Sequence, residues 1–298
     1  MKASSSPWLF RLGFIAPAFV LYVGFVIWPL IQAFQISFYR WRGTSNRVTW
    51  VGTENYEKLR TDPVLSEALG NNLFMMFVGG VLIVILALLV AHALQKSTRV
   101  SQFLESIYLF PQVVSMVVVA LLWQFMFNPQ FGPVPLLQKA LGLGEFQSGW
   151  LATPNVALPA VTVAFAWYAV GFYVMLFSAG LRQIPTEITE ASELDGSTGW
   201  HRFTNVTWPL LWSVKRTGVT YLVITVMNTF ALVYLMTKGQ PDRKTEVALT
   251  YLYEQAFTNS DWGYASALAV VNLFFVMAVT LLVMWIFRRD PTERRARA

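Results

Sequence analysis

The residues with the clearest chemical potential lie in one polar stretch, 183–211, between two long apolar runs. Its carboxylates recur at every third position, at Glu187, Glu190 and Glu193. Pro185 suits the first turn of a helix, and the positive end of that helix favours Glu187. Gly196 can end the helix by adopting a left-handed conformation. The stretch therefore predicts a short acidic helix on the surface of an otherwise apolar chain.

A second short helix is expected to follow, with Ser197 or Thr198 as its cap. Its apolar residues recur at every third position: Trp200, Phe203 and Val206. The first helix has a matching ridge: Ile188, Ala191 and Leu194. The two helices meet at Asp195–Gly196, where small residues would let another backbone approach. Such a protrusion suits docking into a groove on a partner, although a solvated loop that merely connects two spans could have the same composition.

Chemistry of other kinds is missing from the sequence. It contains no phosphate-binding loop with a Gly-Lys-Ser/Thr end, no HExxH, no GxSxG and no dinucleotide-binding fingerprint. There is no cysteine, and the two histidines, His92 and His201, are too few for a metal site built on imidazoles. We therefore predict that the chain is not an enzyme and holds no cofactor or metal of its own.

The elements that position the acidic stretch are predicted to be membrane helices. Of 298 residues, 55% are hydrophobic and 13% are charged, with a mean hydropathy of +0.49, whereas a soluble surface needs about a quarter of charged residues. Continuous apolar runs favour helices over barrel strands. We expect an all-α, polytopic single domain, 1–298, with six transmembrane helices at about 14–34, 73–94, 107–127, 156–180, 211–236 and 265–287.

The basic residues indicate the orientation. With the N-terminus inside, 13 of the 22 lysines and arginines lie on the inner side, as the positive-inside rule requires. Five arginines in the last eleven residues fit a cytoplasmic membrane flank better than a nucleic-acid site. The first apolar run is too long for a cleaved signal peptide. We predict cytoplasmic N- and C-termini and a cytoplasmic acidic loop, residues 183–209.

Two further features bear on transport. Prolines in or beside several predicted spans would kink helices that move, although a static anchor could also hold them. The spans contain no Asp or Glu, which a proton relay or a sodium-coupled carrier usually needs. Lys215 and Arg216 lie near a predicted helix end, where their charges could reach the interface by snorkelling.

The acidic loop carries a family resemblance. Its segment "EASELDGSTGWHRFTNVTWPLL" resembles the EAA motif of ABC-transporter permeases, E-A-A-x3-G-x9-I-x-L-P. The matching residues are Glu190, Ala191, Ser192, Gly196, Val206 and Pro209. Trp208 stands at the leucine position and is the main departure. Segments such as "VGTENY", "LTYLYEQAF" and "GYASALAVV" extend the resemblance to maltose-type (MalF-like) sugar permeases over nearly the whole chain.

The resemblance implies a set of partners. In that family the loop docks onto one of two cytoplasmic ATPases, which bind ATP and Mg²⁺ and drive two permeases between inward-open and outward-open states; an extracytoplasmic solute-binding protein delivers the sugar. The residues expected to couple to the ATPase are Glu190, Ala191, Ser192, Asp195, Gly196, Phe203 and Pro209. Sugar-type systems usually pair two different permeases, so a heterodimer in a bacterial or archaeal inner membrane is expected, in contact with lipid and without nucleic acid.

Polar and aromatic side chains inside the predicted spans are candidates for the sugar path, because sugars offer hydroxyls and flat C–H faces. The candidates are Gln112, Trp167, Tyr168, Asn228, Thr229 and Tyr234. Maltose-type permeases hold ligands near the positions of Gln112, Tyr168 and Thr229. The same side chains could instead tie helices together, the role expected for Asn272.

The sequence thus predicts the permease subunit of an ATP-driven, binding-protein-dependent importer of a sugar, an oligosaccharide or a polyol phosphate. The alternative is a self-sufficient secondary carrier or channel; a membrane-embedded enzyme ranks last. The particular solute and the second permease are not specified by any of these residues.

Overall fold

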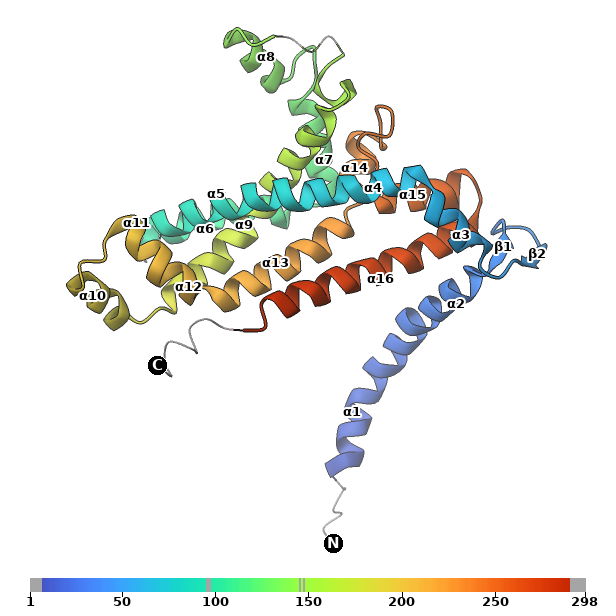
Figure 1. The fold of residues 1–298 in the computed structure, drawn as a ribbon, viewed down its shortest axis with the longest axis horizontal. Helices are drawn as coiled ribbons and strands as arrows, with labels where there is room; N and C mark the ends of the chain where they lie inside the picture. The colour runs from blue at the N-terminus through green and yellow to red at the C-terminus, as the bar shows by residue number, and fades with distance from the viewer. Residues whose placement is uncertain (1–6, 95–97, 145, 147, 290–298) are drawn as a thin grey trace. The chain divides into compact units, whose positions relative to one another are not determined.

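The structure is a computed structural model that describes residues 7–94, 98–144, 146 and 148–289. These residues are mostly helical, with a single two-stranded sheet among them (Figure 1). Contacts divide the chain into two compact units, Met1–Asp62 with Leu252–Leu273 and Pro63–Tyr251 with Phe274–Ala298. The predicted all-α membrane fold is confirmed.

The first unit begins with a long apolar helix. α1 (Pro7–Tyr22), a π-helical turn (Val23–Ile27) and α2 (Trp28–Ile36) follow one another without a gap. The span-length part, Leu12–Ile36, agrees with the predicted span 14–34. Its most apolar window has no buried residue, so these side chains are free to face lipid or other protein.

The rest of the first unit is a small polar cap with four shorter elements: β1 (Tyr39–Trp41), β2 (Val48–Trp50), α3 (Glu54–Thr61) and a π-helical turn (Glu254–Thr258). The strands are antiparallel, with Tyr39 opposite Trp50. The buried Asn55 amide donates hydrogen bonds to the carbonyls of Ser37 at 2.8 Å and Tyr39 at 3.1 Å. One side chain thereby joins α3 to the start of the hairpin.

The second unit contains most of the helices: α4 (Pro63–Phe74), α5 (Gly80–Ala93), α6 (Arg99–Val113), α7 (Met116–Met126), α8 (Pro133–Ala140), a 3-10 turn (Trp150–Ala152), α9 (Ala157–Arg182), α10 (Thr186–Leu194), α11 (Gly199–Arg202), α12 (Trp208–Leu210), α13 (Trp212–Met227) and α14 (Ala231–Met236). π-helical turns lie at Met75–Gly79 and Phe203–Thr207. α15 (Ala248–Tyr253) and α16 (Trp262–Ile286) cross the boundary between the units.

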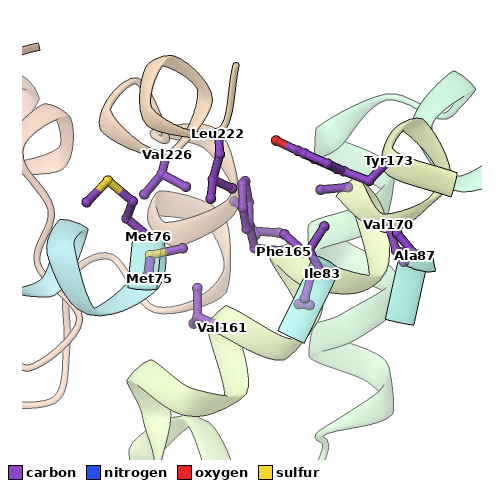
Figure 2. Close-up of a cluster of buried hydrophobic side chains, with 14 of the residues drawn as sticks. Met75, Met76, Ile83, Ala87, Val161, Phe165, Val170, Tyr173, Leu222 and Val226 are labelled. Carbon is purple, nitrogen blue, oxygen red and sulfur yellow. The ribbon is translucent and has the colours of Figure 1, made fainter. Parts of the chain in front are cut away.

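Helix α9 is the centre of the second unit. It packs against α5, α6, α7, α13 and α14 and is apolar nearly all round, as a helix surrounded by others should be. Figure 2 shows part of this core, where Ile83 from α5, Phe165 from α9 and Leu222 from α13 come together. Phe165 and Ile83 are fully buried. Because α9 is firmly packed and leads directly into the acidic loop, it holds the start of that loop in place.

Glycines on α9 permit its close contacts. A Cβ on Gly171 would lie 1.9 Å from the Tyr108 carbonyl oxygen of α6. A Cβ on Gly180 would lie 2.6 Å from a methyl of Val214 on α13. Small residues at such crossings let helix backbones approach, as is common between membrane helices.

The third predicted span, 107–127, is not one straight helix. The chain is already helical from Arg99, ahead of the predicted start of this span at residue 107. α6 and α7 then meet at an angle of 96°. The break occurs because Val114 and Ser115 are extended, and the Ser115 hydroxyl caps α7 by accepting the Val117 N–H at 3.3 Å.

The fifth predicted span, 211–236, is also divided. α13 ends at Met227 and α14 begins at Ala231. Side chains at the end of α13 bond to its carbonyls, Asn228 to Ile224 at 2.7 Å and Thr229 to Thr225 at 3.0 Å. Among the described residues, four helices are long and apolar enough to span a membrane, or five if α6 and α7 form one broken span. The predicted count of six is not confirmed.

Candidate functional site

The acidic loop, residues 183–209, begins with the predicted helix. α10 (Thr186–Leu194) starts directly after Pro185, and Glu187 lies in its first turn. Gly196 ends it with a φ of +75°. The N–H of Gly196 donates to the Glu193 carbonyl at 3.0 Å, and that of Ser197 to the Ser192 carbonyl at 2.8 Å. These bonds form a left-handed glycine cap, which confirms the predicted end, whereas Pro185 is the residue before the helix and not part of its first turn.

The second half of the loop is also helical. α11 passes through the π-helical turn Phe203–Thr207 into α12. Thr198 has the extended backbone of a cap residue, although its side chain makes no capping bond. Pro209 lies in α12, directly after the π-helical turn. The predicted pair of short helices is therefore present, with the second helix continued to the start of α13.

The loop keeps its charges at the surface. Glu187, Glu190 and Asp195 are exposed. Glu193 pairs with Arg202 across the two helices, and their side chains remain 55% and 28% exposed. A surface pair of this kind contributes at most about 1 kcal/mol. The carboxylates are therefore placed for contact with another molecule more than for holding the loop together.

The apolar ridge of the loop faces outward as well. Leu194 is 90% exposed and Trp200 is 77% exposed, and Ala191 is also exposed. Ser192 differs from its neighbours, since it is buried and its hydroxyl donates to the Thr189 carbonyl at 2.7 Å. An outward-facing Leu and Trp beside free carboxylates are typical of a surface that another protein covers.

A recess of about 650 Å³ lies behind this surface. It is lined by the end of α5, the end of α9 and the inner sides of α10 and α11, including Leu88, His92, Leu181, Glu190 and Phe203. The loop therefore lies against the ends of two core helices, α5 and α9. Figure 1 shows α10, α11 and α12 together at one end of the α5, α9 and α13 bundle.

The candidates for the sugar path lie on three different parts of the second unit. Gln112 is half-buried on α6, and Trp167 and Tyr168 lie on α9. Asn228, Thr229 and Tyr234 fall at or just after the break between α13 and α14. Thr229 is buried, while Asn228 is exposed. Their role in binding stays a prediction.

A row of aromatic rings beside Trp167 was missing from the sequence-based candidates. Ring centroids are 5.9 Å apart for Trp167 and Trp123, 5.3 Å for Trp123 and Phe127, and 5.6 Å for Phe127 and Trp150. Phe146 continues the row from Trp150 at 5.2 Å. The spacing of four between Trp123 and Phe127 was the available signal, because residues four apart share one helix face.

Polar side chains also fix a second loop, residues 237–250. Glu246 is 2% exposed, accepts a hydrogen bond from Thr250 at 2.5 Å and pairs with Arg243 at 3.2 Å. From α4, the fully buried Asn72 amide donates to the Val226 carbonyl and its oxygen accepts the Ala248 N–H, both at 3.0 Å. The expectation that spans lack Asp and Glu does not cover Glu246, which lies outside them.

The described residues thus form a helical membrane protein with a compact polar loop between α9 and α13. The chain belongs to the family of binding-protein-dependent transport system inner membrane components, whose profile matches residues 83–289. This match covers the acidic loop and every helix from Ile83, near the start of α5, to the end of α16. The chain is therefore an ABC transporter permease.

Named relatives agree with this assignment. The probable ABC transporter permease protein YurN of Bacillus subtilis is 33% identical over 94% of this chain and 96% of that protein. The diacetylchitobiose uptake system permease NgcF of Streptomyces coelicolor is 31% identical over 94% and 82%. The sn-glycerol-3-phosphate transport system permease UgpA of Brucella suis is 31% identical over 89% and 90%.

A solved structure supports the fold. A chain from a bacterial ABC transporter involved in the import of the acidic polysaccharide alginate superimposes with a TM-score of 0.80 at 21% identity. The superposition covers 95% of this chain and 96% of that one. At this identity the similarity concerns the fold alone.

Proposed function

We propose that the chain is one of two membrane-spanning subunits of a sugar importer, and that its acidic loop is the cytoplasmic docking site for an ATPase. The observation that supports this most directly is the exposure of Leu194, Trp200 and Glu190 on a loop with a fixed helix end at Gly196. Folded loops that expose large apolar side chains beside charges are suited to docking a partner.

The relatives support the substrate class. Their names include uptake systems for diacetylchitobiose, for sn-glycerol-3-phosphate and for multiple sugars, and a solved structure of similar fold includes a periplasmic protein with bound alginate pentasaccharide. We therefore propose that this chain transports a sugar, an oligosaccharide or a polyol phosphate. A solute-binding protein delivers the solute, and a second, different permease subunit pairs with this chain.

The same proposal covers energy and topology. Two cytoplasmic ATPases bind ATP and Mg²⁺, and this chain binds neither. The chain lies in the inner membrane with both termini inside, and the broken segments 99–126 and 212–236 complete six crossings. The six candidate pathway residues on α6, α9 and the α13–α14 break provide ring faces and hydrogen-bonding groups toward the sugar.

Docking is tested by co-purification of this chain with the ATPase subunits of the cell in which it is expressed. Glu190→Arg reverses an exposed charge, and Gly196→Asp places a side chain where φ is +75°; each should abolish recovery of the ATPase while membrane insertion is retained. Glu57→Arg, an equal charge change on exposed α3, is the matched control and should leave recovery unchanged. Equal recovery with all three variants would refute the proposed docking site.

Topology has a direct test because the chain contains no cysteine. Asp195→Cys introduces a single thiol at an exposed position. A membrane-impermeant maleimide should label it in inside-out vesicles and leave it unlabelled in right-side-out vesicles. Labelling from the exterior, or solute uptake by this chain alone in proteoliposomes, would favour the self-sufficient carrier instead.

A further inference from the structure

Lys215, near the start of α13, is buried in an unusual setting. Its side chain is turned inward and is 8% exposed, so snorkelling to the interface does not describe it. Its ammonium donates a hydrogen bond to the Trp208 carbonyl at 2.7 Å. It lies 4.1 Å from the centre of the Trp208 ring and 5.1 Å from that of Trp212. A carbonyl and two ring faces offset part of the cost of burying the charge.

These contacts span the point at which the helix is interrupted between α12 and α13. α12 ends at Leu210, Leu211 leaves the helical conformation with a ψ of 16°, and α13 begins at Trp212. Lys215 therefore reaches back from α13 to the last turn of the acidic loop. Without such a bridge, the two helices would be joined only through the backbone at Leu211 and the packing of its neighbours.

The aromatic contacts continue from Trp208 toward the exposed face of the loop. Its ring centre is 6.0 Å from that of Phe203, and Phe203 is stacked on Trp200 at 5.3 Å. Trp200 is one of the residues that the proposed docking surface exposes. A continuous series of side chains thus runs from that surface to Lys215.

The series also continues from Trp212 to another helix. The Trp212 indole N–H donates to the Phe287 carbonyl at 3.1 Å, and the two ring centres are 4.7 Å apart. Phe287 directly follows the last residue of α16. The acidic loop, α13 and the end of α16 are therefore connected through side chains, in addition to the chain itself.

We propose that Lys215, held between Trp208 and Trp212, is a positioning residue that makes the acidic loop move with α13 and with the end of α16. The inference rests on the proposed docking of an ATPase to this loop. It also accounts for the departure at Trp208, since the leucine of the motif has no ring face to offer a cation.

The test follows the distance between loop and helix in the assembled transporter. Because the chain has no cysteine, Glu187→Cys on α10 and Ile224→Cys on α13, both exposed, accept one spin label each. Distances are measured without nucleotide and after trapping the ATPases with ADP and vanadate. In the otherwise unchanged chain, the distance should be the same in both states.

Three further substitutions identify the role of Lys215. Lys215→Met should shift or broaden the distance distribution on trapping, while Lys215→Arg, which keeps a cation over the rings, should restore it. Arg216→Met removes the charge of the exposed neighbour and should behave as the unchanged chain. Trp208→Leu, which installs the residue of the motif, should resemble Lys215→Met.

The outcomes separate the two proposals. If no ATPase binds the unchanged chain, the proposed function fails. If the ATPase binds and traps, but Lys215→Met gives the distribution of the unchanged chain, the positioning role alone is refuted. If both Lys215→Met and Trp208→Leu fail to fold, the cluster is a packing element and the positioning role is refuted as well.

Discussion

Two loops of the second unit, 183–209 and 237–250, use polar residues in opposite ways. In the acidic loop the carboxylates are exposed, and the bonds that shape it are local, as in the cap at Gly196. In the second loop Glu246 is buried and Asn72 bonds a residue 176 positions away. One loop is shaped by local bonds and leaves its carboxylates exposed. The other loop joins helices that are distant in sequence.

The comparison predicts what a substitution should do in each of the two loops. A polar residue that satisfies buried groups affects stability, because its removal leaves those groups unpaired. A polar residue on a locally folded, exposed loop affects association and leaves the fold nearly unchanged. Substitutions of the buried polar residues should therefore have the largest effects on stability.

The largest effect should come from Glu246→Ala. It removes the buried carboxylate that bonds Arg243 and Thr250, and hydrogen bonds to a charged group contribute about 1.5–3 kcal/mol each. Thermal unfolding in detergent measures the loss. Glu67→Ala is the matched control, because Glu67 pairs with Lys244 at the surface and should cost under about 1 kcal/mol. Equal losses for the two variants would contradict the contrast.

Asn72→Leu should have the next largest effect. The Ala248 N–H would lose its partner in a buried site, at about 1–3 kcal/mol, while the Val226 carbonyl would keep the bond from the Thr229 N–H. Asn71→Leu removes a single bond to the Glu246 carbonyl from a half-buried position and should cost less. If Asn72→Leu destabilised the protein less than Asn71→Leu, the bonds of Asn72 would not be what holds the second loop in place.

Gly196→Ala should affect the acidic loop locally. An alanine at a φ of +75° costs about 1 kcal/mol, which corresponds to about fivefold faster opening of the last turn of α10. Amide hydrogen exchange of Gly196→Ala and of the unchanged chain measures this, while the melting temperature should stay the same. A global loss of stability would mean that the loop is not folded independently.

The smallest effect concerns the Lys244–Glu67 pair. The hydrogen bond to the Glu67 carboxylate holds the pKa of Lys244 above its usual value of 10.5. Stability from this pair is therefore complete below pH 10.5 and is lost as pH rises through the raised pKa. The difference in unfolding between this chain and Lys244→Met should shrink over that range. A constant difference would show that the pair does not contribute.

The acidic loop could be predicted from the sequence because its signals are local. Pro185, the spacing of three and Gly196 each lie within a few residues of the structure they determine. Four of the six predicted spans also correspond to long apolar helices, for the same reason: an apolar run without an interruption leaves a membrane helix as the simplest solution.

The breaks in the other two spans were not predicted. Ser115 and Asn228 look like single polar residues in an apolar run, yet their side chains bond to the backbone at helix ends. Whether such a residue caps a helix or faces a neighbour depends on tertiary contacts. The bonds of Asn72 and Trp212 join residues 154 and 75 positions away, so no local pattern could have identified them.

At Gly171 the backbones of α6 and α9 touch through the Tyr108 carbonyl, with no room for a methyl group. Because α6 also packs along α9 on either side of this point, sliding of one helix along the other would drive bulkier side chains into the contact. The close approach at Gly171 therefore fixes the register of α6 on α9. An alanine introduced at Gly171 would act as a wedge and change the angles that the two helices can reach.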